Sequence, residues 1–272
     1  MAELPFIAFV DETLRDSPLY PKFYVLTAAI VDRSKPEYAA LQKVMHRVAR
    51  TQPTGMIHAS EMARAQNSQE GLVSVEREIG ENAAVRALAV VHSPFGAGGE
   101  EEARQRCVAE LMVTLSSAFD VSSVTMDSRD PLGISSKSTI PRRGTRNFKD
   151  LATVRGLQAI GELPEDLAVS HANDRLINGL WIADVASYAV GSSLARRDPS
   201  RLQWIAPHLY MREARILPVS ERKDTHQTTA PVTDLSFYLN AFVEQAKAIH
   251  DRASGLFEDE EEPEEDLATG AY

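Results

Sequence analysis

The stretch from Phe6 to Glu12 constrains the fold of this chain more than any other. Five apolar residues, Phe6-Ile-Ala-Phe-Val10, are followed directly by the carboxylates of Asp11 and Glu12. A continuous apolar run of this kind predicts a strand buried on both faces. A second run, Phe23–Val31, follows after a proline-containing segment, which predicts a hairpin with a loop. We therefore expect a central strand that ends at two carboxylates, held by a hard cation or solvated in a loop.

Strand and helix patterns alternate along the rest of the chain. Strands are expected at residues 85–91, 121–127 and 167–170, with an edge strand at 215–219; helices are expected at residues 36–50, 72–79, 100–115, 148–160, 176–194 and 233–257. This order predicts an α/β fold with a mixed β-sheet flanked by helices. Without a convincing linker before Glu258, residues 1–257 are expected to form one domain with a helical C-terminal extension. Residues 258–272 form an acidic tail without apolar periodicity and are expected to be disordered.

Composition narrows the class of protein. The chain has 272 residues, of which 43% are hydrophobic and 25% charged, as in ordinary globular proteins. Eight carboxylates of the tail account for most of the net charge of −10, so the body, at about −2, does not argue against a nucleic-acid partner. No apolar run approaches the roughly 18 residues of a membrane span, and no signal-peptide pattern is seen. The single cysteine, Cys107, excludes an internal disulfide framework. We expect a cytoplasmic protein without a membrane partner.

Asp184 is the only charged residue between Leu176 and Ala195. A helix that is apolar nearly all round packs in the core, and Asp184 lies too far inside it to cap its N-terminus. An unpaired buried carboxylate would cost on the order of several kcal/mol. Asp184 is therefore expected to meet a cation, to line a cleft, or to bond within a local network, for instance with Tyr188.

Asp127 ends a predicted strand, as Asp11 does, and such strand ends face the ligand crevice in open α/β sheets. Glu61 could join them from the start of a helix. Carboxylates without thiolates favour Mg²⁺ or Mn²⁺ over zinc, and two such ions can assist a phosphoryl displacement. The sequence predicts such a metal site at Asp11, Asp127, Asp184 and Glu61; the alternative is that these carboxylates do not meet.

Two further groups could assist such a site. His58, three residues before Glu61, could carry protons or orient Glu61; alternatively it is structural. The segment after Asp127 is basic and predicts contacts to a phosphate backbone; alternatively it is a solvated loop, paired with the tail. Its basic residues are Lys137, Arg142, Arg143, Arg146, Lys149 and Arg155.

Four motifs carry a resemblance to a known family. They are Phe9-Val-Asp11-Glu12-Thr, Ile57-His58-Ala-Ser-Glu61, the strand ending at Asp127, and Asn178-Gly-Leu-Trp-Ile-Ala-Asp184. In this order they resemble the bacterial family catalogued as domain of unknown function 3800, which is placed in the ribonuclease H-like superfamily. The resemblance implies a ribonuclease H-like fold with acidic residues on the first strand, the fourth strand and a C-terminal helix. The chain departs from the family pattern at Thr13 and at Trp181, where glycine or serine and glutamine are expected.

Together, the residues and the resemblance predict a metal-dependent nuclease that hydrolyses phosphodiester bonds of DNA or RNA, in a mobile-element or phage-defence setting. Asp11, Asp127 and Asp184 would hold Mg²⁺ or Mn²⁺, with Glu61 or Glu12 in support and His58 as a proton carrier. Two alternatives stay open. One is a non-catalytic module that binds nucleic acid or protein, and the other is phosphoester chemistry on a small nucleotide.

Overall fold

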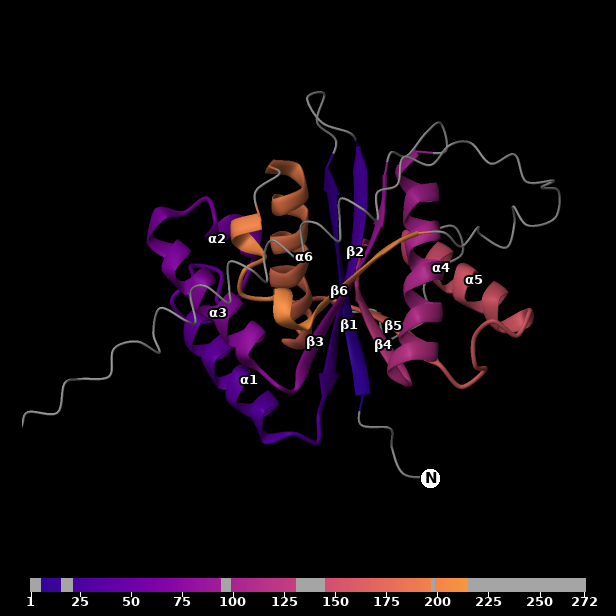
Figure 1. Ribbon diagram of the computed structural model, residues 1–272, viewed down its shortest axis with the longest axis horizontal. Helices are drawn as coiled ribbons and strands as arrows, with labels where there is room; N and C mark the ends of the chain where they lie inside the picture. Colours follow the sequence, from indigo (N-terminus) through magenta and orange to yellow (C-terminus); the bar gives the residue numbers. More distant parts are fainter. Residues whose placement is uncertain (1–5, 16–21, 94–98, 131–144, 197–198, 215–272) are drawn as a thin grey trace, which may run out of the picture.

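The computed structural model describes residues 6–15, 22–93, 99–130, 145–196 and 199–214. Within them, one six-stranded sheet carries helices on both faces (Figure 1). The strands are β1 (Phe6–Arg15), β2 (Phe23–Asp32), β3 (Val85–His92), β4 (Ser123–Asp127), β5 (Ala168–Ala172) and β6 (Leu209–Glu213). The helices are α1 (Pro36–Ala49), α2 (Ala59–Met62), α3 (Gln69–Glu81), α4 (Gly99–Phe119), α5 (Arg146–Ala159) and α6 (Gly179–Arg196). Three short 3₁₀ helices are η1 (Gln66–Ser68), η2 (Pro199–Arg201) and η3 (Ala206–His208).

The sheet is mixed, with strand order β5-β4-β1-β2-β3-β6. β1, β2 and β3 form an antiparallel meander. β4 pairs parallel to β1, β5 pairs parallel to β4, and β6 pairs parallel to β3. The C-terminal ends of β1, β4 and β5 therefore lie at one edge of the sheet, where ligands bind in open α/β folds.

Both faces of the sheet are covered, so the described part of the chain has two apolar cores. Helices α1, α3 and α6 pack on one face, and α4 and α5 pack on the other (Figure 1). Residues of β2 alternate between them: Val25 and Ala29 join the first core, whereas Leu26 and Ile30 join the second. This burial on both sides is the physical reason for the uninterrupted apolar sequence of the central strands.

The predicted α/β class with a mixed sheet and flanking helices is confirmed, but β1 differs from its prediction. It does not end at Val10 and continues to Arg15, because its antiparallel ladder with β2 extends over the full strand. The parallel ladder with β4 stops at the pair Val10–Met126. Asp11 is therefore the first residue of β1 beyond the end of β4, while the strand itself still fixes its backbone.

Several predictions concern the C-terminal part of the chain. The observed edge strand β6 precedes the predicted one, and residues 215–219, the helix at 233–257 and the acidic tail at 258–272 lie outside the described residues. The extent of the domain stays a prediction. Across the described residues, no helix has both the length and the apolar character needed to cross a membrane.

Helix α6 approaches β1 unusually closely, and this contact sets the position of Asp184. A Cβ atom on Gly179 would overlap the ring of Phe9, and one on Gly191 would overlap the side chain of Thr13. The Thr13 hydroxyl also donates to the carbonyl of Ser187 (3.2 Å) and lies 2.9 Å from its Oγ. Phe9, Asp11 and Thr13 share one face of β1 because side chains alternate along a strand.

We expect Gly191→Ala to destabilise the fold by about 1–3 kcal/mol, the usual cost of overpacking a core. The added Cβ would lie 2.9 Å from the Thr13 Cβ, so helix and strand have to separate. Urea denaturation of Gly191→Ala, Thr13→Ala and the double variant measures this contact. The double variant should lose less stability than the sum of the two single variants; strict additivity would show that the close approach is not the cause.

Candidate acidic site

Asp11 is the centre of the acidic site. It lies on the α6 face of β1, just beyond the end of β4. Burial raises its pKa well above the ordinary value, and the negative charges of Asp184 and Asp127 raise it further. The guanidinium of Arg104 opposes this effect. Among the described residues, the Asp11 carboxylate has neither a hydrogen-bond donor nor an ion-pair partner.

Asp184 reaches the site from the middle of α6, one turn before the contact between Ser187 and Thr13. One of its oxygens accepts a hydrogen bond from the backbone N–H of Ala59 (2.8 Å), the first residue of α2. Burial raises the pKa of Asp184 to about 6, although the Ala59 N–H and the neighbouring His58 favour its charged form. The lone charge in an apolar helix is thus half-buried, and its charged neighbours are His58 and the carboxylates of Asp174 and Asp127.

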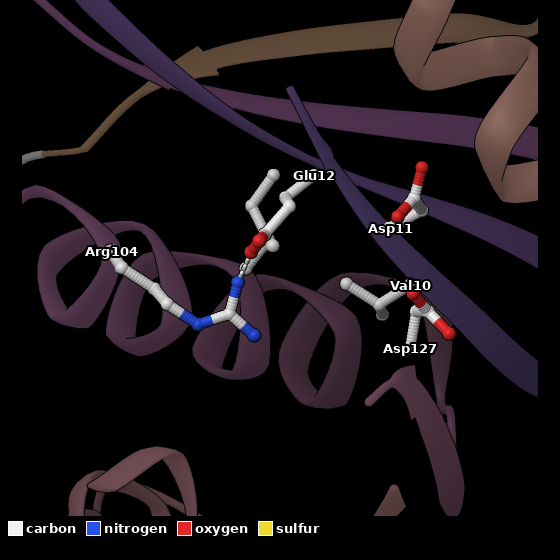
Figure 2. A pocket seen from close by; sticks show the side chains of 6 residues that line it. Val10, Asp11, Glu12, Arg104 and Asp127 are labelled. Atoms are coloured by element: carbon white, nitrogen blue, oxygen red, sulfur yellow. Dashed lines mark ion pairs between the residues drawn. The ribbon is translucent and has the colours of Figure 1, made fainter. Parts of the chain in front are cut away.

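Asp127 is the last residue of β4 and lies beside Asp11 (Figure 2). Burial raises its pKa to about 6, and the charge of Asp174 adds to this effect. Hydrogen bonds from the backbone amides of Ser128 and Asp174 oppose it. The sheet therefore brings together the ends of β1 and β4, as the strand-end argument requires.

Asp174 belongs to the site and was not among the residues expected from the sequence. It follows β5 by two residues, and its charge raises the pKa of Asp11, Asp127 and Asp184. Its Oδ2 lies 3.4 Å from Nδ1 of His58. The strand-end rule that selected Asp127 could have found it, because β5 is parallel to β4 and ends at the same edge.

We call Asp11, Asp127, Asp174 and Asp184 the acidic cluster. Its four half-buried carboxylates come from β1, β4, the loop after β5, and α6. Across the part of the chain that the structure describes, no three His, Cys, Asp or Glu side chains surround a common point at ligand distance. The donor type nevertheless fits a hard divalent cation, because all four donors are carboxylates and because burial, together with neighbouring negative charges, raises the pKa of three of them.

Glu12 points to the opposite face of β1 and lies away from the acidic cluster. Its carboxylate pairs with Arg104 of α4 and accepts a hydrogen bond from the hydroxyl of Tyr24. Figure 2 shows Glu12 turned toward Arg104, with Asp11 on the other side of the strand. Adjacent residues of a strand face opposite ways, so the two carboxylates that end the apolar run have different partners.

Arg104 continues this contact into a buried polar network. It is only 2% exposed and makes two hydrogen bonds of 2.9 Å to Asp150, which has no exposed surface. Asp150 also lies 3.0 Å from Nε2 of His171 and 3.6 Å from Arg129. Burial alone would raise the pKa of Asp150, but the hydrogen bonds from His171 and Arg104 and the charges of both arginines lower it to about 2.

A cavity of about 10 Å³ separates this network from the acidic cluster, and Figure 2 shows residues that line it. It lies among Asp11, Glu12, Arg104 and Asp127, with Val10 and Leu26 as apolar walls. This volume has room for about one water molecule. A water there would meet polar groups of both faces.

The structure places the remaining candidate residues as follows. His58, the N-cap of α2, is one-third exposed; its ring contacts Asp174, and its backbone carbonyl accepts a hydrogen bond from the Glu61 N–H. The side chain of Glu61 is exposed and is not among the main charges that act on the acidic cluster. A metal-binding role of Glu61 stays a prediction.

Only part of the predicted basic segment is described. Lys137, Arg142 and Arg143 lie outside the described residues. Arg146 is exposed at the first position of α5, and the Lys149 ammonium lies 3.7 Å from Glu101. The N-terminus of α5 is tied to the end of β4, since Asp130 accepts hydrogen bonds from the backbone amides of Arg146 and Asn147. Contacts to phosphate remain a prediction for all four basic residues, Arg142, Arg143, Arg146 and Lys149.

Two solved structures are similar in fold to this chain. One is the ribonuclease HII of Archaeoglobus fulgidus in its complex with PCNA, with a TM-score of 0.39 and 14% identity over 70% of this chain and 74% of that chain. The other is the ribonuclease H2 of Pyrococcus horikoshii, with a TM-score of 0.36 and 13% identity over 91% of this chain and 98% of that chain. No protein-family model matches the sequence, and no curated protein matches it either.

The fold class is read from the sheet itself. The antiparallel β1–β2–β3 meander, with β4 and β5 parallel beside β1 and helices on both faces, confirms the predicted α/β class with a mixed sheet.

Proposed function

We propose that this chain is a divalent-metal-dependent nuclease that hydrolyses phosphodiester bonds of DNA or RNA. The observation that carries the proposal is the acidic cluster: burial and like charges raise the pKa of Asp11, Asp127 and Asp184 in the absence of a basic partner of matching strength. Such a cluster is costly to a folded protein and is typical of functional sites. A cation bound by these carboxylates offsets their repulsion.

Asp11, Asp127 and Asp184 are the residues that would hold Mg²⁺ or Mn²⁺, and Asp174 is the fourth carboxylate in reach of their charge. When bound, such an ion supplies an activated water and stabilises the charge that develops on the phosphate. The four carboxylates that would hold it come from four separate elements. The rigid sheet fixes Asp11 and Asp127, and the Ala59 N–H fixes one oxygen of Asp184.

His58 and Asp174 would move the proton that hydrolysis requires. Asp174 faces Nδ1 of His58 and thereby favours the ring orientation in which Nε2 points away from it. His58 is one-third exposed and would give a proton to the leaving oxygen of the diester. In this assignment the partner of His58 is Asp174 and not Glu61.

The proposal also covers the family, the location and the partner of the protein. The motifs around Asp11, His58 and Asp184 support membership of the family named domain of unknown function 3800. We also propose a cytoplasmic location, a nucleic-acid partner and a mobile-element or phage-defence role. Basic side chains at the start of α5, including Arg146, would contact the phosphate backbone from beside β4.

The test is cleavage of labelled single-stranded DNA, duplex DNA, RNA and RNA–DNA hybrids with Mn²⁺, with Mg²⁺ and with EDTA. We expect metal-dependent cleavage by the wild type and a loss of about 10³-fold or more in Asp184→Asn, since the ligand set loses a charge at the reacting centre. Asp166→Asn, at an exposed carboxylate before β5, serves as the matched control and should cleave like the wild type. Full activity of a folded Asp184→Asn variant would refute the proposal.

A further inference from the structure

A second cavity, of about 300 Å³, lies against the acidic cluster, and the proposed chemistry does not use it. Three elements form it: the end of β1, helix α2 with the residues just after it, and α6. Its walls are formed by Glu12, Thr13, Leu14, Ser60, Ala63, Arg64, Asp184 and Tyr188. Asp184 belongs both to this cavity and to the acidic cluster, so a group bound here lies next to the reacting phosphate.

The wall of this cavity combines apolar surface with hydrogen-bonding groups. Leu14 is 37% exposed, one of the few exposed large apolar residues among those described, and Tyr188 follows Asp184 by one turn of α6. Ser60 and Arg64 are exposed on the α2 side, and no ion pair of Arg64 is found among the described residues. The carboxylate of Glu12 is held by Arg104 on the other face of the sheet.

This mixture fits a heteroaromatic base with its sugar better than it fits an ion or a fatty chain. An apolar side chain can cover the face of a base, and hydroxyl groups can bond its edge. Arg64 at the rim can meet the phosphate that links it to the next nucleotide. A volume of about 300 Å³ stands at the small end of ligand pockets, roughly 300–1,000 Å³, and so has room for one nucleotide-sized group.

We propose that this cavity binds one unpaired nucleotide adjacent to the phosphodiester that the acidic cluster cleaves. The inference rests on the proposed nuclease function and specifies its substrate. A base held in a duplex stack cannot enter the cavity without unpairing, and unpairing has an energetic cost. The preferred substrate is therefore a single strand, or a duplex with an unpaired nucleotide at the cleavage position.

The first experiment fills the cavity from its exposed side. Ser60→Trp introduces a large ring at a solvent-exposed position of α2, where the core is not disturbed. With Mn²⁺, we expect kcat/KM for a single-stranded oligonucleotide to fall at least about tenfold more than kcat/KM for bis(p-nitrophenyl) phosphate, a diester without a base to place. Ser74→Trp, at an exposed serine of α3, is the matched control and should behave like the wild type on both substrates.

The second experiment measures binding without cleavage. Fluorescence anisotropy with a labelled single strand, in Ca²⁺ buffer, should show weaker binding by about three- to tenfold for Arg64→Gln, because one phosphate contact is lost. A blunt duplex of the same sequence should bind more weakly than the single strand to the wild type. The cavity assignment would be overturned if the wild type bound the single strand and the duplex equally well. It would also be overturned if neither Ser60→Trp nor Arg64→Gln weakened binding of the single strand.

The two proposals fail in different ways. A wild type that binds the single strand through Ser60 and Arg64 but hydrolyses neither substrate would contradict the nuclease and support the cavity. A wild type that hydrolyses bis(p-nitrophenyl) phosphate, with a Ser60→Trp variant that cleaves the oligonucleotide as well as the wild type does, would support the nuclease and contradict the cavity.

Discussion

Replacing Asp11 with asparagine is expected to stabilise the metal-free protein and to remove most of its stabilisation by Mn²⁺. In the folded chain the pKa of Asp127 and of Asp184 is about 6, and the pKa of Asp11 is also raised. Unfolded aspartate titrates near about 3.9. The folded protein thus binds more protons between these values, so its free energy of unfolding falls as the pH rises from about 4 to 6.

Above that window the charges of the acidic cluster repel one another, and Asp11→Asn removes one of them. We expect the melting temperature of metal-free Asp11→Asn at pH 8 to exceed that of the wild type by about 2–4 °C, as for a gain of ~1 kcal/mol. The difference should vanish near pH 4, where the aspartates are protonated in the wild type as well. Thermal denaturation in EDTA at both pH values measures it.

The stabilisation by Mn²⁺ should be smaller in Asp11→Asn than in the wild type. Mn²⁺ at about 100 times its dissociation constant stabilises the wild type by ~2.7 kcal/mol, and the shift should be small for Asp11→Asn. For wild type and Asp166→Asn we expect the same Mn²⁺ shift, since Asp166 is remote from the cluster and exposed. A metal-free Asp11→Asn that melts below the wild type at pH 8 and keeps the full Mn²⁺ shift would contradict the site.

Arg104→Met is expected to destabilise the protein by about 3–5 kcal/mol, the usual cost of leaving a buried charge without its partner. Arg104 is the main partner of the fully buried Asp150 and also contacts Glu12 and the Tyr24 hydroxyl, at 2.7 Å in the latter case. Without Arg104, Asp150 keeps only the contacts with His171 and Arg129, and it loses both hydrogen bonds from the guanidinium. Urea denaturation at pH 7 measures the loss.

Arg106→Met in the same helix is the matched control. Arg106 pairs with Glu102 one turn away, both partly exposed, and such surface pairs contribute only about 0.3–0.5 kcal/mol. The double variant Arg104→Met with Asp150→Leu should recover part of the lost stability, because no charge is then left unpaired. If Arg104→Met costs no more than Arg106→Met, the network does not stabilise the fold.

The acidic residues that could be predicted from the sequence are those that stand out against their immediate neighbours in the chain. Asp184 is the one charged residue of the predicted apolar helix at 176–194, and Asp11 directly follows an apolar run. In both places a charged side chain is unexpected, which marks the residue as a candidate. The alternation of side chains along a strand also predicts that Asp11 and Glu12 diverge. These are short-range rules, and they were sufficient to indicate where the acidic cluster forms.

Arg104 could not be found by the same means, and only the strand-end rule could have pointed to Asp174. Asn173-Asp174-Arg175 has the composition of an ordinary turn, and Arg104 stands among charged residues of α4 as an exposed arginine would. Their environments come from residues distant in the chain: Arg104 meets Asp150, and Asp174 meets His58. Only the packing of the sheet and its helices brings these pairs together.

The parallel pairing of β1 with β4 also has a consequence for the order of folding. The β1–β2–β3 meander joins strands that are neighbours in sequence, whereas β4 reaches β1 only across the whole of that meander and α4. Long-range pairings of this kind form slowly. Asp11 is also synthesised more than 100 residues before Asp127 and Asp184. We therefore expect the meander that carries Asp11 to form before the pairing that brings the other acids beside it.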